Sequence, residues 1–217
     1  MQLKENGQKN LKLNKINKKF VYLISPNKIL DINFYDDLAL VFSSKKINFF
    51  QLRLKKETNL NKLIIGKKIK IICNKYKVKF LINDDPLLAK KLNADGCHLG
   101  QKDMDLIKAR KILKNKIIGV TCHNSINLAK RAIKDGANYL AFGAFYATKT
   151  KTVKYRASLT VLKSIKKITS LPIVAIGGIK LSNYKKLLLN KANFLAISGY
   201  IWNNKKYKPL EAIRKLK

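Results

Sequence analysis

The chain has 217 residues, a length that suits one barrel or one doubly wound sheet. Hydrophobic residues make up 47% of it, which allows a large core and excludes an intrinsically disordered protein. Its formal net charge is +35, a value that favours contact with nucleic acid or an anionic membrane surface. The lysines are spread over the whole chain without one basic block, so we interpret most of them as solvated helix faces that also attract phosphorylated substrates.

The cysteines and the N-terminal segment are those of a cytoplasmic protein. Cys73, Cys97 and Cys122 form neither a disulfide framework nor a CxxC pair, and two histidines are too few for a zinc site with them. Residues 1–19 are polar and basic and lack the apolar stretch of a signal peptide, so we expect a basic leader or a short helix there. The sequence contains no apolar run of 18 residues, so it predicts no membrane span. We therefore expect a cytoplasmic protein without a membrane partner.

Eight short apolar runs recur along residues 20–217, and lysine-rich segments separate them. They cover Phe20–Ile24, Phe49–Leu52, Phe80–Ile82, Gly96–Leu99, Ile117–Val120, Tyr139–Phe142, Ile173–Ile176 and Phe194–Ile197. Runs without polar alternation are typical of parallel strands that are buried on both faces. Helical spacing appears between them, for example over 61–76, 85–93, 103–114, 125–135, 159–169 and 182–190. Eight strand–helix units predict one (β/α)₈ TIM barrel over residues 20–217.

Small polar residues stand at several predicted helix starts. We expect Asn124–Ser125 to cap the helix after the fifth strand and Ser182 to cap the helix after the seventh. Gly136 stands where a helix ends and the next strand begins, a position that favours glycine.

The second predicted strand ends in a basic stretch. Alternation along Gln51-Leu52-Arg53-Leu54-Lys55 places Gln51, Arg53 and Lys55 on one face. The chemistry of such barrels lies at the C-terminal ends of the strands, so this face points into the mouth. A guanidinium and an ammonium there predict an anion site. The alternative is an exposed basic strand end, which applies most to Lys55.

The third and fourth predicted strands are followed by acidic residues. The chain holds only 12 Asp and Glu, so Asp84 and Asp103 at neighbouring strand ends stand out. Carboxylates beside a phosphate site suit Mg²⁺. Helix capping is the alternative: Asp85 before Pro86 is typical of an N-cap, and Asp103 could serve as one too. For Asp84 we favour the metal role.

The fifth strand leads into Thr121-Cys122-His123. The Thr121 hydroxyl can bind a phosphate, and His123 either orients a ligand or has a structural role. We expect Cys122 to be a packing residue.

The last three strands end in glycines and hydroxyl residues. After the sixth strand, Thr148, Thr150 and Lys151 form a stretch that can hold an anion, although lysine is abundant everywhere in this chain. Gly177–Gly178 and Ser198–Gly199 stand where such barrels bind phosphate through backbone N–H groups, with tight turns as the alternative.

Seven motifs occur in a fixed order: QLRLK at 51–55, IND at 82–84, ADGCHLGQKD at 94–103, GVTCH at 119–123, FGAFYATKTK at 142–151, VAIGGI at 174–179 and IS at 197–198. In this order and spacing they resemble the thiamine phosphate synthase family, from about Tyr22 to Ile201. Departures from the family pattern include Ala144 and Ala147 in place of prolines and Thr121 in place of a serine. None of them removes a charged or metal-binding group.

The resemblance implies two phosphate subsites and a metal. The diphosphate of 4-amino-5-hydroxymethyl-2-methylpyrimidine diphosphate would contact Gln51, Arg53, Lys55, Asn83, Thr121 and Lys151. A thiazole phosphate would contact Thr148, Lys149 and Thr150, and the backbone of Gly178, Ile197 and Ser198. Asp84 and Asp103 would bind Mg²⁺. In the reaction so implied, diphosphate leaves first and the thiazole nitrogen then attacks a pyrimidine-stabilised cation. Arg53, Lys55 and Lys151 would neutralise the leaving group, so no nucleophile from the chain is needed.

Two other functions are open at this stage. A relative on the same barrel, similar to a thiazole tautomerase, would bind a thiazole phosphate without Mg²⁺, but it would leave Arg53, Lys55, Asp84 and Asp103 without a task. A nucleic-acid-binding protein would account for the charge, yet the scattered lysines predict no specific nucleic-acid partner. The sequence leaves the oligomeric state open, including a homo-oligomer.

Overall fold

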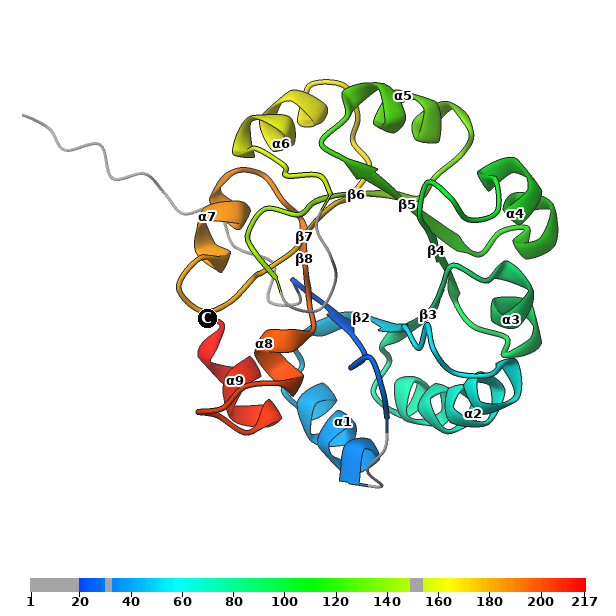
Figure 1. Cartoon of the computed structure of the whole chain (residues 1–217), viewed down its shortest axis with the longest axis vertical. Helices are drawn as coiled ribbons and strands as arrows, with labels where there is room; N and C mark the ends of the chain where they lie inside the picture. The colour runs from blue at the N-terminus through cyan, green and yellow to red at the C-terminus, as the bar shows by residue number, and fades with distance from the viewer. Residues whose placement is uncertain (1–19, 30–32, 149–153) are drawn as a thin grey trace, which may run out of the picture.

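The computed structural model describes residues 20–29, 33–148 and 154–217. Eight parallel strands pair in chain order and close into a barrel, with helices arranged around it (Figure 1). The predicted TIM barrel is therefore confirmed. The basic leader expected over residues 1–19 lies outside the described residues, and so do Lys149, Thr150 and Lys151.

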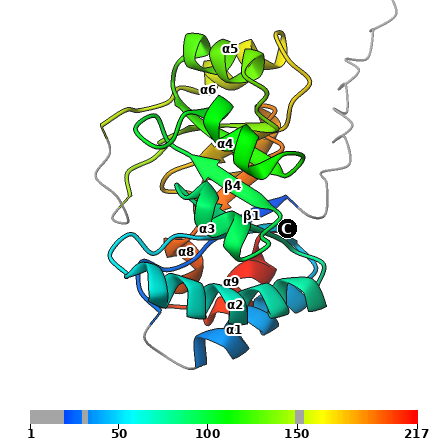
Figure 2. The ribbon, with the colours of Figure 1, turned by 90° about the vertical axis from the view of Figure 1, so that its right-hand side faces the viewer.

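All eight predicted runs are strands. They are β1 (Val21–Ile24), β2 (Ile47–Leu52), β3 (Lys79–Asn83), β4 (Gly96–Leu99), β5 (Ile117–His123), β6 (Tyr139–Gly143), β7 (Ile173–Ile176) and β8 (Phe194–Ile197). The described helices are α1 (Asn33–Ser43), α2 (Asn59–Lys75), α3 (Pro86–Lys91), α4 (Leu106–Leu113), α5 (Ile126–Lys134), α6 (Leu159–Lys166), α7 (Tyr184–Leu189), α8 (Gly199–Trp202) and α9 (Pro209–Lys215). Figure 2 shows the barrel from the side, with α1, α2 and α9 close together at one flank.

Side chains alternate along each strand between the barrel interior and the helix layer. An inner cluster includes Tyr22, Leu81 and Tyr139, while a larger outer cluster joins strand residues such as Leu23 and Phe80 to the helices. Both faces of every strand are therefore covered, which explains why the runs read as continuously apolar. The same alternation turns the last inward residue of each strand toward the mouth.

Strand register aligns the ends that carry polar residues. Asn83 of β3 pairs with His98 of β4, and His98 pairs with Gly119 of β5. The backbone N–H of Asp84 donates to the His98 carbonyl over 2.8 Å, which extends the β3–β4 pairing past the end of β3. Asp84 is thereby fixed at the rim of the barrel.

Helix caps follow the prediction at two of three sites. The Ser125 hydroxyl accepts the Leu128 N–H at the start of α5, and the Asp85 carboxylate accepts the Leu88 N–H at the start of α3. The prediction for Ser182 is wrong, because α7 has Asn183 at its N-cap position.

Basic side chains hold the opposite, N-terminal ends of the strands together. Arg110 donates to backbone carbonyls of Lys114, Lys116 and Gly136 and to the Asn138 side chain, over 2.6–2.9 Å. Lys46 donates to carbonyls near the end of α9, including that of Arg214 over 2.9 Å. These cations stabilise the loops before the strands.

The cysteine prediction is confirmed: Cys73, Cys97 and Cys122 are buried and unpaired. Burial raises the pKa of each thiol, that of Cys122 to about 12, so all three behave as packing residues. Within the described part of the chain, none of the helices has the length and apolar character needed to cross a membrane.

Candidate active site

The end of β2 carries the predicted basic face. Gln51 is buried inside the barrel at 3% exposure, Arg53 is half-buried, and Lys55 is exposed. Leu52 and Leu54, which alternate with them, are buried in the outer core cluster, as a period-two strand requires.

Lys55 forms an ion pair with Asp84. The Lys55 Nζ lies 2.8 Å from the Asp84 Oδ2, and the side chains are 51% and 27% exposed. Asp84 has a φ of +64°, a conformation that non-glycine residues adopt rarely and that recurs at functional sites. An ion pair this exposed adds little stability, so a ligand can displace it at low cost.

Asp103 lies against Asp84 from the neighbouring loop. Its carboxylate accepts the Gly100 N–H over 2.6 Å and is close enough to the Asp84 carboxylate for each to shift the pKa of the other. The capping alternative is wrong for Asp103, because α4 begins at Leu106 and Asp105 is its cap. Asp103 is therefore available for the site.

The two carboxylates have opposite pKa shifts. Burial disfavours the charged form of Asp84, but hydrogen bonds with Asp103 and Lys55 and the attraction of the Lys55 ammonium outweigh it, so its pKa lies below the usual value. Burial and the hydrogen bond with Asp84 raise the pKa of Asp103. Two carboxylates this close repel each other when both are charged, and a divalent cation between them would relieve that repulsion.

The donor set fits Mg²⁺. Over residues 20–29, 33–148 and 154–217, no three His, Cys, Asp or Glu side chains gather into a metal cluster. Mg²⁺ does not need three, since it binds through one or two carboxylates and completes its shell with water and substrate phosphate oxygens. Asp84 and Asp103 are such a pair, and Lys55 stands beside them.

Two donors next to the carboxylates are suited to an anion. The Arg53 guanidinium donates to the Asn27 side chain over 3.1 Å; burial lowers its pKa and the nearby Asp84 raises it. Within the described residues, the buried Gln51 Nε2 has no hydrogen-bond partner. A buried donor without an acceptor is costly, so this amide is well placed to meet a ligand oxygen.

Asn83 and Thr121 also lie at this side of the mouth. Asn83 is the last residue of β3 and is half-buried next to Asp84. The Thr121 hydroxyl is 2.8 Å from the His98 Nε2. Gln51, Arg53, Lys55 and the two aspartates lie there too. The described residues of the predicted diphosphate and metal sites are therefore all found toward the ends of β2 to β5.

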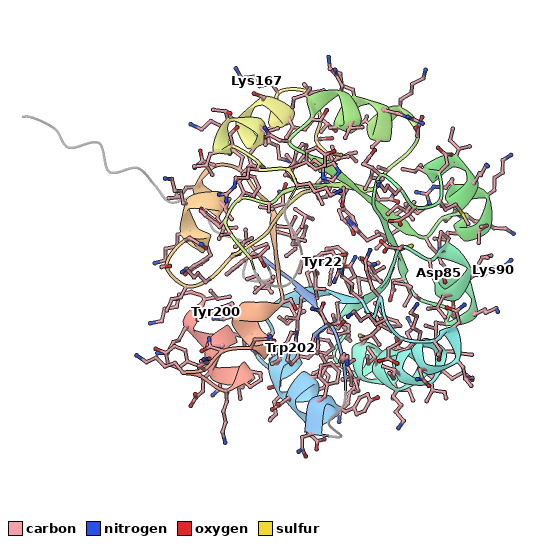
Figure 3. All side chains as sticks on the ribbon, in the orientation of Figure 1. Tyr22, Asp85, Lys90, Lys167, Tyr200 and Trp202 are labelled. Atoms are coloured by element: carbon pink, nitrogen blue, oxygen red, sulfur yellow. The ribbon has the colours of Figure 1, made fainter. Side chains whose placement is uncertain are left out.

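Three interior residues escaped the sequence reasoning. The His98 Nδ1 lies 2.8 Å from the Tyr139 hydroxyl, which lies 2.9 Å from the Tyr22 hydroxyl. Tyr22 projects into the middle of the barrel (Figure 3). The alternation of β4 from Gly96 to His98 would have placed His98 inward. The tyrosines gave no signal because they stand inside apolar runs.

The ends of β6 to β8 are built mainly from backbone. Gly178 has a φ of +63°, and a Cβ there would lie 2.3 Å from the Ala147 carbonyl oxygen. The loop after β6 packs directly on it, since the Tyr146 N–H donates to the Gly177 carbonyl over 3.1 Å. The tight-turn interpretation thus explains the glycines, and their phosphate role stays a prediction.

The remaining predicted contacts on this side are located in part. The Ile197 side chain is buried against the helix layer, so only its backbone can reach the mouth. The Ser198 hydroxyl donates to the Ser25 carbonyl over 3.0 Å and joins the ends of β8 and β1. Thr148 is half-buried at the last described position before residues 149–153.

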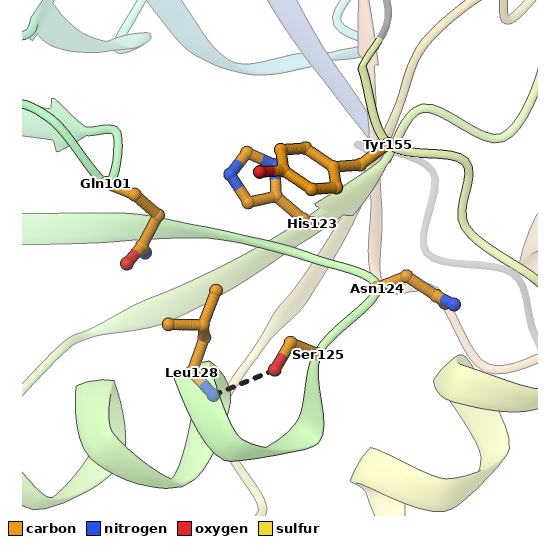
Figure 4. A pocket seen from close by; sticks show the side chains of 6 residues that line it. All are labelled: Gln101, His123, Asn124, Ser125, Leu128 and Tyr155. Atoms are coloured by element: carbon orange, nitrogen blue, oxygen red, sulfur yellow. Dashed lines mark hydrogen bonds between the residues drawn. The ribbon is translucent and has the colours of Figure 1, made fainter.

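A pocket of about 360 Å³ lies beside the end of β5 (Figure 4). It is lined by Gln101, His123, Asn124, Ser125, Leu128 and Tyr155. The His123 ring packs against the Tyr155 ring, with centroids 4.3 Å apart and planes tilted by 32°. Neither Asp84 nor Asp103 lines this pocket, so we place the candidate site at the mouth, where the charged groups converge.

Comparison with known proteins bears on the same residues. The sequence model of a family described as thiamine monophosphate synthase matches residues 21–201. The chain is 95% identical over 207 residues to the thiamine-phosphate synthase of Pelagibacter ubique, which covers 95% of this chain and 100% of that protein. It is 38% identical over 190 residues to the thiamine-phosphate synthase of Clostridium acetobutylicum, covering 87% of this chain and 89% of that protein.

A solved structure agrees with the sequence relatives. The thiamine phosphate pyrophosphorylase from Pyrococcus furiosus superposes with a TM-score of 0.79 at 27% identity, covering 94% of this chain and 96% of that one. A 3-hexulose-6-phosphate synthase, at 17% identity and a TM-score of 0.63, shares the fold. Given the family match and the near-identical relative, the chain belongs to the thiamine monophosphate synthase family, transferases of thiamine biosynthesis.

Proposed function

We propose that this enzyme couples 4-amino-5-hydroxymethyl-2-methylpyrimidine diphosphate to a thiazole phosphate in a Mg²⁺-dependent reaction that releases diphosphate. The observation that carries the proposal is the ion pair of Lys55 and Asp84 over 2.8 Å at the rim, with the Asp103 carboxylate near enough to shift the pKa of Asp84. Two carboxylates and a lysine at one rim suit a metal-bound diphosphate better than a neutral ligand.

The diphosphate subsite follows from the described donors. Arg53 can contact two phosphate oxygens through its planar guanidinium, and Lys55 adds a mobile charge at the rim. The unpartnered Gln51 amide lies deeper, and Asn83 and Thr121 border the same space. Lys151 completes the set as a prediction from the family resemblance, since it lies outside the described residues.

The proposed mechanism is dissociative. The bond between the pyrimidine methylene carbon and the diphosphate oxygen breaks first, and the thiazole nitrogen then bonds to that carbon. Arg53 and Lys55 stabilise the charge that develops on the leaving oxygen, while the barrel wall keeps water from the cation. When bound at Asp84 and Asp103, Mg²⁺ would supply further neutralisation of the departing diphosphate.

The thiazole phosphate is assigned to the ends of β6 to β8. Thr148, Lys149 and Thr150 would supply side-chain contacts, and Gly178, Ile197 and Ser198 would supply backbone contacts. The close packing of Ala147 on Gly178 supports this assignment, because it leaves backbone groups rather than bulky side chains at that rim. Strand ends seven and eight are also where such barrels commonly bind phosphate.

A metal-independent thiazole tautomerase is the rival on this fold. It would leave the ion pair of Lys55 and Asp84 and the neighbouring Asp103 without a chemical task. Chelation separates the two functions: the synthase loses turnover in EDTA, whereas isomerisation of a thiazole phosphate without metal would support the rival.

The proposal is tested by incubating the purified protein with the pyrimidine diphosphate, the thiazole phosphate and Mg²⁺. We expect thiamine phosphate and free diphosphate in equal amounts. A folded protein that forms neither product would refute the proposed function.

A further inference from the structure

Four inward side chains from four strands form one hydrogen-bonded chain across the barrel. It runs from Tyr22 on β1 to Tyr139 on β6, then through His98 on β4 to Thr121 on β5. The three links are 2.9, 2.8 and 2.8 Å long. The chain begins in the apolar interior and ends at a hydroxyl near the mouth.

The buried Tyr22 end of this hydrogen-bonded series fixes the direction in which each hydroxyl proton points. Tyr22 and Tyr139 are 2% and 3% exposed and stand among apolar residues. Among the described residues, Tyr139 is the hydrogen-bond partner of the Tyr22 hydroxyl. Burial raises the pKa of both phenols, so each hydroxyl keeps its proton. The Tyr22 proton must therefore point to the Tyr139 oxygen, because a buried donor without an acceptor is strongly disfavoured.

The rest of the order follows from counting donors. Tyr139, having accepted from Tyr22, donates its single proton to the His98 Nδ1. His98 then carries its proton on Nε2 and donates it to the Thr121 oxygen. The reverse order would leave the Tyr22 proton without an acceptor, so it would be populated less by about tenfold or more.

The barrel makes room for this chain. At Gly119, two residues before Thr121, a Cβ would lie 1.8 Å from the Cζ of Tyr139. Only a glycine there lets the Tyr139 ring reach His98. The two rings then stack, with centroids 5.7 Å apart and planes 17° apart. The His98 ring is thus held in one orientation by packing as well as by its hydrogen bonds.

We propose that Tyr22, Tyr139 and His98 are positioning residues that make the Thr121 hydroxyl an obligatory donor toward the diphosphate of the pyrimidine substrate. Because the Thr121 oxygen already accepts from His98, its own proton is left to point elsewhere, toward the half-buried mouth. A diphosphate oxygen only accepts hydrogen bonds, so a hydroxyl locked as a donor suits it. The identity of this ligand rests on the proposed function, whereas the proton order does not.

The proton order can be read directly by ¹⁵N NMR of histidine-labelled protein without substrate. The chain has only two histidines, so the signals that disappear in His98→Gln belong to His98. We expect a protonated Nε2 and a bare Nδ1. A proton on Nδ1, or on both ring nitrogens, would overturn the inference whatever the enzyme's substrate.

Kinetics test the consequence for the substrate. Tyr139→Phe removes the donor to Nδ1, so we expect mixed tautomers and a kcat/KM for the pyrimidine diphosphate lower by about tenfold, with the KM for the thiazole phosphate unchanged. Tyr184→Phe is the matched control, because it removes a buried hydroxyl that bonds to the Lys217 backbone outside the barrel. Its kcat/KM should stay at the wild-type value.

A rescue pair at position 98 completes the test. Glutamine can place an amide N–H near the Nε2 position and donate to Thr121, whereas asparagine is too short to reach it. We expect His98→Gln to retain more kcat/KM than His98→Asn. Equal losses in both variants, or wild-type kinetics in Tyr139→Phe, would overturn the positioning role. An inactive wild type would instead refute the proposed function and leave the NMR result to decide the proton order.

Discussion

Arg53 and Arg110 do different work at opposite ends of one barrel. Arg110, at the N-terminal ends of the strands, directs its donors to three backbone carbonyls and one side-chain oxygen. Arg53, at the C-terminal ends, contacts Asn27 and lies in the field of Asp84. Protein oxygens accept hydrogen bonds from both terminal nitrogens of Arg110. Arg53 keeps N–H donors that a ligand can engage. Sequence alone therefore does not tell a structural arginine from a functional one; the acceptors around each guanidinium do.

The largest effect should come from the carboxylate pair at the functional end. Asp84→Asn removes one of the two proposed Mg²⁺ ligands, so turnover should fall at least about 1000-fold at fixed Mg²⁺, because a metal contributes several kcal/mol to such transition states. Steady-state diphosphate release measures it. The neighbouring Asp85→Asn is the control, since asparagine caps α3 equally well. Similar losses in both variants would show that the effect is structural.

The two arginines give the next effect and the direct contrast between the ends. Arg53→Ala should raise the barrier by about 3 kcal/mol, a typical cost of one preorganised charge contact, with little change in Tm. Arg110→Ala should leave kcat near the wild-type value and lower the free energy of unfolding by about 2 kcal/mol. Kinetics and urea unfolding of both variants test this. An Arg53→Ala enzyme of unchanged rate would refute the diphosphate role.

Asp95, at the N-terminal ends of the strands, should contribute stability that is lost in acid. Its carboxylate accepts the Phe80 N–H and pairs with Lys70 and Lys79 at the structural end. Burial raises the pKa of Asp95, but these three partners lower it by more than burial raises it. The folded pKa therefore lies below the unfolded one. Its stabilisation is therefore present above the unfolded pKa, which is near 3.8, and is lost as pH falls through the folded value.

Asp95→Asn should thus lower the free energy of unfolding by about 1 kcal/mol at pH 7. The difference from wild type should shrink as the pH is lowered past 4, since the wild-type carboxylate then becomes protonated. Urea unfolding across pH 3 to 7 measures both. A difference that stays constant over this range would show that the ion pairs add nothing.

The smallest effect should come from the overall charge of +35. A positive surface steers anionic substrates to the mouth, and salt screens this attraction over about 8 Å at physiological ionic strength. Raising the salt concentration should lower kcat/KM for the pyrimidine diphosphate several-fold and leave kcat nearly unchanged. A salt-independent kcat/KM would mean that the scattered lysines play no part in substrate capture.

The fold was predictable because buried parallel strands leave continuous apolar runs. The errors fall where polar residues continue a strand: β2 begins at Ile47 and β5 extends to His123, because backbone pairing persists beyond the apolar stretch. The cap at Asn183 was missed because Ser182 stands one residue earlier and has the same propensity. Local preference thus locates elements but not their last residues.

The candidate site was predictable where charge and strand ends coincide, as at Arg53 and Asp84. His98 was missed because its role depends on Tyr139, 41 residues away, and on the space left by Gly119. Asp103 was ambiguous between a cap and a metal ligand until the structure assigned the cap to Asp105. Contacts between distant strands decide such roles, and no local pattern contains them.

We propose that a Mg²⁺ bound by Asp84 and Asp103 is required for the coupling. It is tested most directly by measuring diphosphate release by the wild type, with both substrates present, first in excess chelator and then after Mg²⁺ is added back. We expect no release above background in chelator and full recovery with Mg²⁺, but no recovery in Asp84→Asn at the same Mg²⁺ concentration. A full rate in excess chelator would contradict it.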